Sequence, residues 1–164
     1  MGNNDAIAAV NHWRGQCLDN FARVEKAIIV AYASSCITGL SAPPRLHESA
    51  AKRTENLANA LKQHFPEAPI AKKAVSRLGH WSLREKQRNG LVHGCFTVKG
   101  DEASNWSLIN EVTEIKKGVG VTRQLPMSEG EAAAFLRAII DERKELESAL
   151  RELKTLKHKK PISA

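Results

Sequence analysis

Residues 86–96, KQRNGLVHGCF, place an arginine, an asparagine and a histidine within six positions, followed at once by a glycine. Histidine is the side chain best suited to take up or release a proton during a reaction near neutral pH, and His93 could do so. The guanidinium of Arg88 stays charged, and its planar fork matches a pair of phosphate oxygens. The segment therefore combines side chains suited to acid–base chemistry at an anionic group.

The segment lies at the end of a predicted helix that begins near Ile70. Five apolar residues share one side of this helix, which we expect to be buried: Ala74, Val75, Leu78, Trp81 and Val92. Glu85, Asn89 and His93 follow on the same side at four-residue steps. The stripe therefore becomes polar toward its C-terminal end, while Arg88 lies about 140° around the helix from His93.

Burying such polar groups without partners costs on the order of 1–3 kcal/mol each. They must therefore hydrogen-bond inside a core or line a cleft, and the spacing alone leaves both interpretations open. A histidine in the last turn of a helix is also favoured by the helix macrodipole, which would be a purely structural role. Gly94 stands just beyond the helix, where we expect a left-handed C-terminal cap.

Apolar residues at three- and four-residue steps predict two helices before this one and one after it. The first runs from about Asp5 to Thr38, and the second from about Arg45 to Phe65. The last begins around Ser128, with Glu131 as its capping-box partner, and extends to about Lys157. Its apolar seam packs either against the first helix or against a second copy of the chain.

Between residues 95 and 125 the pattern changes to β-branched and aromatic residues separated by turn-like stretches. We expect a small antiparallel hairpin or a three-stranded insertion there. The predicted fold is therefore mainly α, an antiparallel helical bundle with a small β-hairpin insertion before a long C-terminal helix. The 164 residues are expected to form a single domain over 1–164, with a basic tail from about 154 to 164.

The chain is basic, with a formal net charge of +7 and a sequence pI near 9.5. Such a surface attracts polyanions, so RNA, DNA and acidic lipid headgroups are all plausible partners. The excess is partly local, because the stretch KTLKHKK at 154–160 contains four lysines. This tail is either a solvated basic end or a phosphate-binding segment.

Three widely spaced cysteines, Cys17, Cys36 and Cys95, form no CxxC pair and indicate neither a disulfide framework nor a zinc site. The best apolar run, 27–40, is shorter than the roughly 20 residues that a membrane span needs, and no signal peptide is evident. We expect a cytoplasmic protein with reduced thiols. The histidines outside the motif form no metal-ligand pattern, and no phosphate loop or GxSxG elbow is present, so neither a metal nor a cofactor is expected.

The RNGLVH stretch resembles the R-x4-6-H motif of HEPN domains, in which a polar residue, often asparagine, follows the arginine. Arg88, Asn89 and His93 match this motif, and Gly94 follows it as in many members. The motif covers only six residues, whereas the predicted layout, a helical bundle with a long closing helix, matches most of the chain loosely. The segment from Cys95 to Leu125 is an elaboration on the minimal bundle.

The resemblance implies a metal-independent endoribonuclease, often a toxin or an antiviral effector, that acts as a homodimer with one composite cleft. The ribose 2′-hydroxyl would be the nucleophile, and the products would carry a 2′,3′-cyclic phosphate and a 5′-hydroxyl. His93 would act as general base or acid, Arg88 would stabilise charge on the phosphorus, and Asn89 would orient His93 or bind the phosphate. Glu85 would be a supporting residue that orients the others.

Basic side chains outside the motif would contact the RNA backbone: Arg84, Lys154, Lys157, Lys159 and Lys160. A cognate antitoxin or inhibitor protein is a further partner that the toxin interpretation allows. The alternative is a non-catalytic helical dimer that binds a nucleotide or a partner protein through the same polar cleft. Both hypotheses predict a dimer, so RNA cleavage, and not oligomeric state, distinguishes them.

Overall fold

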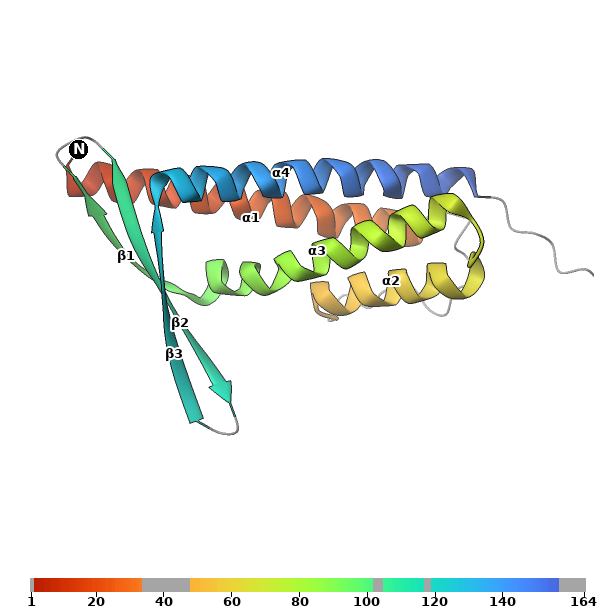
Figure 1. The fold of residues 1–164 in the computed structure, drawn as a ribbon, viewed down its shortest axis with the longest axis horizontal. Coiled ribbons are helices and arrows are strands. Elements are labelled where there is room, and N and C mark those ends of the chain that lie inside the picture. Colours follow the sequence, from red (N-terminus) through yellow and green to blue (C-terminus); the bar gives the residue numbers. More distant parts are fainter. Residues whose placement is uncertain (1, 34–47, 102–104, 117–118, 157–164) are drawn as a thin grey trace, which may run out of the picture. The chain divides into compact units, whose positions relative to one another are not determined.

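The computed structural model describes residues 2–33, 48–101, 105–116 and 119–156, which are mainly helical (Figure 1). The α-helices in this part of the chain are α1 (Asn3–Ala33), α2 (Ala50–His64), α3 (Pro69–His93) and α4 (Glu129–Glu152). Strands β1 (Cys95–Gly100), β2 (Trp106–Lys116) and β3 (Val119–Ser128) lie between α3 and α4, and the short 3-10 helix η1 (Leu153–Thr155) follows α4. The predicted mainly α fold with a β insertion before the last helix is therefore confirmed.

The described residues divide into two compact units, and the boundaries fall inside α1, α3 and α4. The first, which we call the sheet unit, comprises Met1–Phe21 and Arg84–Asp141 and contains all three strands. The second, the helix unit, comprises Ala22–Leu83 and Glu142–Ala164. No helix in the described ranges is both long enough and apolar enough to cross a bilayer.

In the helix unit, local sequence signals explain how α2 begins and what it buries. Ser49 caps its first turn by accepting a hydrogen bond from the Lys52 backbone N–H at 3.2 Å. Leu57 and Leu61, one turn apart, are fully buried, as an amphipathic helix requires. The predicted start at Arg45 and the predicted end of the first helix at Thr38 both lie outside the described residues.

The capping box predicted at the start of α4 is confirmed. The Ser128 backbone N–H and hydroxyl both donate to the Glu131 carboxylate at 2.7 Å, and the Glu131 N–H donates to the Ser128 hydroxyl at 3.3 Å. The hydrogen bonds from Ser128 hold the pKa of Glu131 below its ordinary value. At the other end, α4 stops at Glu152 and η1 ends at Thr155, whereas Lys157 lies outside the described residues.

The sheet is antiparallel, in the order β1-β2-β3, and the paired strands β2 and β3 extend beyond the end of β1. β1 pairs only with the first half of β2, from Cys95↔Glu111 to Gly100↔Trp106, whereas β2 and β3 remain paired to Lys116↔Val119. Figure 1 shows β2 and β3 continuing as a two-stranded ribbon beyond the edge of β1. Residues at alternate positions of β2, Trp106, Leu108 and Asn110, are buried, so they define the covered face of the sheet.

Trp13 of α1 joins the elements of the sheet unit. Its ring centroid lies 6.1 Å from that of Trp106 and 6.2 Å from that of Phe135, both in tilted arrangements. Its indole N–H donates to the Ala132 backbone carbonyl at 2.8 Å, so the buried ring is also fixed in rotation. This cluster connects α1, β2 and the start of α4 around one aromatic side chain.

The two described cysteines are free thiols in opposite environments. Cys17 is fully buried, and this burial raises its thiol pKa to about 12, whereas Cys95 at the start of β1 is exposed. Because the thiolate is the reactive form, Cys17 should stay neutral and unreactive at pH 8. We expect iodoacetamide to alkylate Cys95 but not Cys17 in the native protein, as read by peptide mass mapping.

Guanidinium chloride supplies the control for this labelling, since unfolding should expose Cys17 and make it as reactive as Cys95. Equal labelling of the two thiols in native buffer would contradict the packing of Cys17 in the α1 core.

Candidate functional site

At the C-terminal end of α3, the residues that are buried differ from those that the sequence predicted to be buried. Three of the five apolar residues predicted to be buried, Ala74, Leu78 and Trp81, are buried, and Val75 is half-buried. Val92, however, is 36% exposed, and Leu91 is buried in its place at 4% exposure.

The buried positions in the last turns of α3 are spaced three residues apart, which moves the buried face around the helix. Glu85 is buried, Arg88 is half-buried, and Leu91 and Gly94 are buried, so the covered line advances by three residues at a time. Three-residue steps turn the covered line progressively around a helix of 3.6 residues per turn. Asn89 and His93 are therefore exposed, and the prediction that they share the buried side is wrong.

Gly94 is required because Asn110 of β2 packs directly against it. A Cβ atom at Gly94 would overlap Asn110 Oδ1 and the Gly90 carbonyl oxygen, and would lie 2.8 Å from Asn110 Cγ. The Asn110 Nδ2 group donates to the Gly90 carbonyl at 3.2 Å, and the Gly94 N–H donates to the same oxygen at 3.0 Å. The backbone of Gly94 is outside the left-handed region, so the predicted left-handed cap is wrong. Close approach of the sheet, and not a positive φ, demands this glycine.

Arg14 of α1 satisfies the carbonyl groups at the end of α3. Its Nε donates to the Leu91 carbonyl at 2.6 Å and its Nη2 donates to the Val92 carbonyl at 3.0 Å. Its guanidinium lies 4.7 Å from the centre of the Phe96 ring on β1. A cation at a helix C-terminus is also favoured by the macrodipole. Arg14 thus fixes the helical turn that carries His93.

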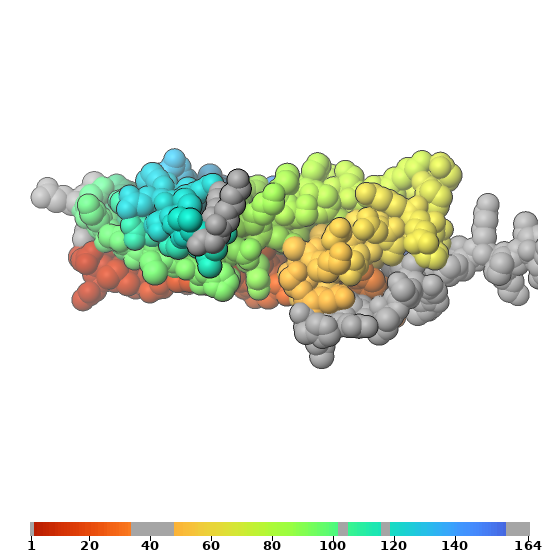
Figure 2. All heavy atoms as spheres, turned by 90° about the horizontal axis from the view of Figure 1, so that it is seen from below, coloured from red at the N-terminus to blue at the C-terminus, as the bar shows by residue number. Residues whose placement is uncertain are grey.

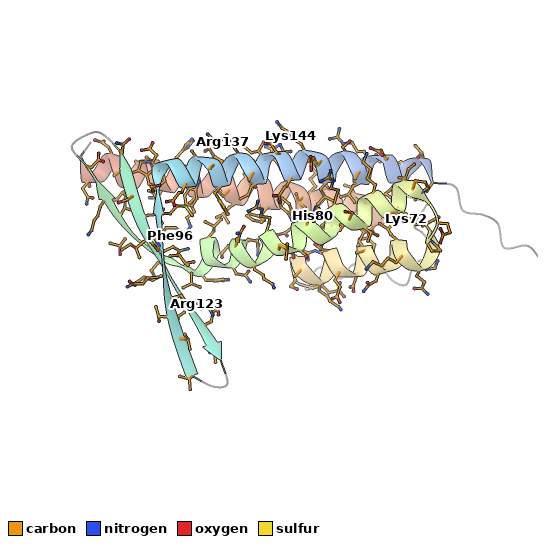
Figure 3. All side chains as sticks on the ribbon, viewed as in Figure 1. Lys72, His80, Phe96, Arg123, Arg137 and Lys144 are labelled. Carbon is orange, nitrogen blue, oxygen red and sulfur yellow. The ribbon has the colours of Figure 1, made fainter. Side chains whose placement is uncertain are left out.

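Between the end of α3 and the covered face of β2 and β3 lies an open cavity of about 620 Å³. Apolar side chains from five elements line it: Trp13, Leu91, Leu108, Val112, Leu125, Met127 and Phe135. The Val112↔Arg123 register places Arg123 on the same face of the hairpin, and Figure 3 shows its side chain projecting from β3. In Figure 2 the strand atoms, green to cyan, lie beside the red atoms of the start of α1, which belongs to the same unit.

The polar side chains that line this cavity are mostly exposed: Lys86, Gln87, Asn89, His93, Arg123 and Glu114. Asn89 and His93, one helical turn apart on α3, therefore face the same open space. The imidazole of His93 is accessible to solvent and is not sealed inside the protomer. Arg88 does not line this cavity.

The remaining predicted site residues lie in different surroundings. Arg84 is half-buried, with its guanidinium 5.7 Å from the centre of the Phe135 ring and its Nη1 donating to the Gln87 side chain at 3.0 Å. Glu85 is buried at 6% exposure. Lys154 is exposed in the helix unit, whereas the other tail lysines, Lys157, Lys159 and Lys160, lie outside the described residues.

Four residues of this site were not anticipated from the sequence: Arg14, Lys86, Asn110 and Arg123. Lys86 adjoins the motif and could have been included because of its position. Arg123 and Asn110 could have been found only by correctly pairing the strands, and Arg14 had no local signal. Over the described ranges, no group of three or more histidine, cysteine, aspartate or glutamate side chains could hold a metal ion.

Comparison of the chain with protein-family models, with curated proteins and with solved structures gives no match.

Proposed function

We propose that this chain is a HEPN-like, metal-independent endoribonuclease of the toxin or defence type, acting in the cytoplasm. The 2′-hydroxyl of the RNA attacks the adjacent phosphorus, and the products carry a 2′,3′-cyclic phosphate and a 5′-hydroxyl. The single observation that supports this proposal most is the shared cavity. His93 and Asn89 of the motif face one open space that is also lined by the cations Lys86 and Arg123.

In this proposal His93 moves the proton. As a neutral imidazole it accepts the 2′-hydroxyl proton, and as an imidazolium it protonates the leaving 5′-oxygen. Its exposure in the cavity allows a phosphodiester to approach it. Asn89 lies one turn earlier, where its amide can orient the imidazole or donate to a phosphate oxygen.

Arg88 is the reason for proposing a composite site between two copies of an antiparallel helical bundle. It lies about 140° from His93 on the helix and does not line the cavity that holds His93. A twofold axis near the end of α3 would bring Arg88 of one copy toward His93 of the other. The guanidinium would then stabilise the charge that develops on the phosphorus.

Phosphates outside the scissile position would contact other cationic side chains. Lys86 and Arg123 line the cavity itself and join Arg84 and the basic tail as proposed backbone contacts. Glu85 is buried, so its proposed supporting role is to position α3 and not to touch RNA.

Cleavage in excess EDTA tests the proposal. We expect the purified protein to cut RNA under these conditions and to leave 2′,3′-cyclic phosphate ends, because neither the nucleophile nor the acid–base group needs a metal. Mass spectrometry of the fragments identifies the ends. Binding of RNA without any cleavage, with and without divalent cations, would instead favour the non-catalytic binding protein.

A further inference from the structure

We infer that the cavity beside His93 holds one nucleobase of the RNA, next to the phosphodiester that is cut. The inference rests on the proposed function for the identity of the substrate. Binding of a base can nevertheless be measured without any cleavage, so the two ideas can fail separately.

The size and lining of the cavity suit a flat heterocycle. Its volume of about 620 Å³ falls within the roughly 300–1,000 Å³ typical of small-molecule sites. Phe135 is half-buried and offers aromatic surface, and it packs on Trp13, which is itself buried at 5% exposure and fixed by its hydrogen bond to Ala132. A rigid aromatic wall stacks on a base without losing side-chain freedom when the ligand binds.

Amide groups around the same space distinguish a base from a purely apolar ligand. Gln87 and Asn89 are exposed, and their amides offer hydrogen-bond donors and acceptors to the edge of a nucleobase. Asn110 is only 8% exposed, and its Oδ1 accepts no hydrogen bond from the described residues. This oxygen is itself buried against Gly94, so Asn110 forms part of the cavity wall, and the exposed amides of Gln87 and Asn89 are the ones that a ligand can reach. An acyl chain would make no hydrogen bond with them.

Charge indicates which end of a nucleotide lies at the mouth of the cavity. Among the described residues that line the cavity, Lys86 and Arg123 are exposed and cationic, and Glu114 carries the one carboxylate. The buried part of the lining is mainly apolar, with Trp13 and Leu108 among its residues. The phosphate therefore belongs at the exposed cations near His93, and the base belongs inside.

Calorimetry with the four nucleoside 3′-monophosphates tests this arrangement, with ribose 5-phosphate and inorganic phosphate as comparisons. We expect at least one nucleotide to bind about tenfold or more tightly than ribose 5-phosphate, the effect that one base-stacking contact produces. Equal affinity for nucleotides and ribose 5-phosphate would overturn the inference. Nucleotide binding should also change the NMR chemical shifts of the backbone amides of Gly90, Val112 and Leu125 in the unmodified protein. Binding that leaves these three amide shifts unchanged would overturn the inference as well.

A matched pair of substitutions on β3 then locates the base. Leu125 is 50% exposed and lines the cavity, so Leu125→Trp should fill the space and reduce nucleotide affinity by about tenfold or more without disturbing the core. Val119 is 64% exposed on the same face of β3 but does not line the cavity, so Val119→Trp should bind as the unmodified protein does. Similar affinities for both variants would contradict the inference.

The cleavage assay separates this inference from the proposed function. His93-dependent cleavage together with failure of every nucleotide to bind would disprove the base site and leave the ribonuclease intact. Nucleotide binding that Leu125→Trp abolishes, without cleavage of any RNA, would disprove the ribonuclease and leave a nucleotide site.

Discussion

His93→Ala is expected to reduce the rate of RNA cleavage in excess EDTA by about 10²–10⁴-fold, the contribution typical of a general acid or base. Alanine cannot accept the 2′-hydroxyl proton or supply one to the leaving oxygen. If two copies of the chain each contribute His93 to one cleft, a single substitution removes both groups, and the upper part of that range applies. The measurement is initial cleavage rate at matched protein concentration.

His80→Ala is the matched control for this substitution. His80 is exposed and, like His93, belongs to α3, but it lies in the helix unit and outside the cavity. Both variants should keep the circular dichroism and unfolding midpoint of the unmodified protein, because both imidazoles are exposed. A His93→Ala protein that cuts RNA as fast as His80→Ala would remove the assignment of His93 as the proton-transfer group.

The parts of this fold that local sequence determines could be predicted, and the capping box shows why. Ser128 and Glu131 are three residues apart, so their reciprocal hydrogen bonds depend only on the helix that they start. The change from helical spacing to β-branched residues after Cys95 is equally local, and it correctly predicted the position of the strands.

The orientation of the motif could not be predicted, because distant residues decide it. Arg14 holds the Leu91 carbonyl across 77 positions of sequence, and Asn110 contacts Gly90 across 20. These contacts require that α1 and β2 both meet the end of α3. A helical wheel at 100° per residue assumes that one face is buried along the whole helix. Here contact with the sheet buries Leu91 and Gly94 instead, and Asn89 and His93 are exposed.

The contact between Asn110 and α3 also explains why glycines stand inside the six-residue motif and directly after it. Gly90 and Gly94 lie one turn apart, and the Asn110 amide packs against both. Asn89 and His93 stand one residue before each glycine, on the adjacent strip of the helix. The glycines therefore allow the sheet to approach α3 closely, and the polar residues beside them line the open cavity between α3 and the sheet.

Gly94→Ala should consequently lower the free energy of unfolding by about 1–3 kcal/mol or more, the usual cost of adding a methyl group to a packed site. The added Cβ would overlap the Asn110 amide oxygen and the Gly90 carbonyl oxygen, and one of these is backbone that cannot rotate away. Urea unfolding followed by circular dichroism measures the change. Cleavage should fall as well, since relief of the overlap must move β2 or the turn that carries His93.

Gly79→Ala, also in α3, provides a control of the opposite sign. Apart from its own stretch of helix, a Cβ at Gly79 would meet no atom of the described residues within 4 Å. The substitution should therefore raise the free energy of unfolding by about 0.5–1 kcal/mol through helix propensity alone. In the double variant Gly94→Ala/Asn110→Ala, the overlap with the amide disappears but the overlap with the Gly90 carbonyl remains. It should therefore show a non-additive, partial recovery relative to the sum of the two single changes. If the two single changes in the free energy of unfolding simply add, or if Gly94→Ala is as stable as Gly79→Ala, then Asn110 does not press on Gly94. In that case the sheet would not explain why His93 faces the cavity.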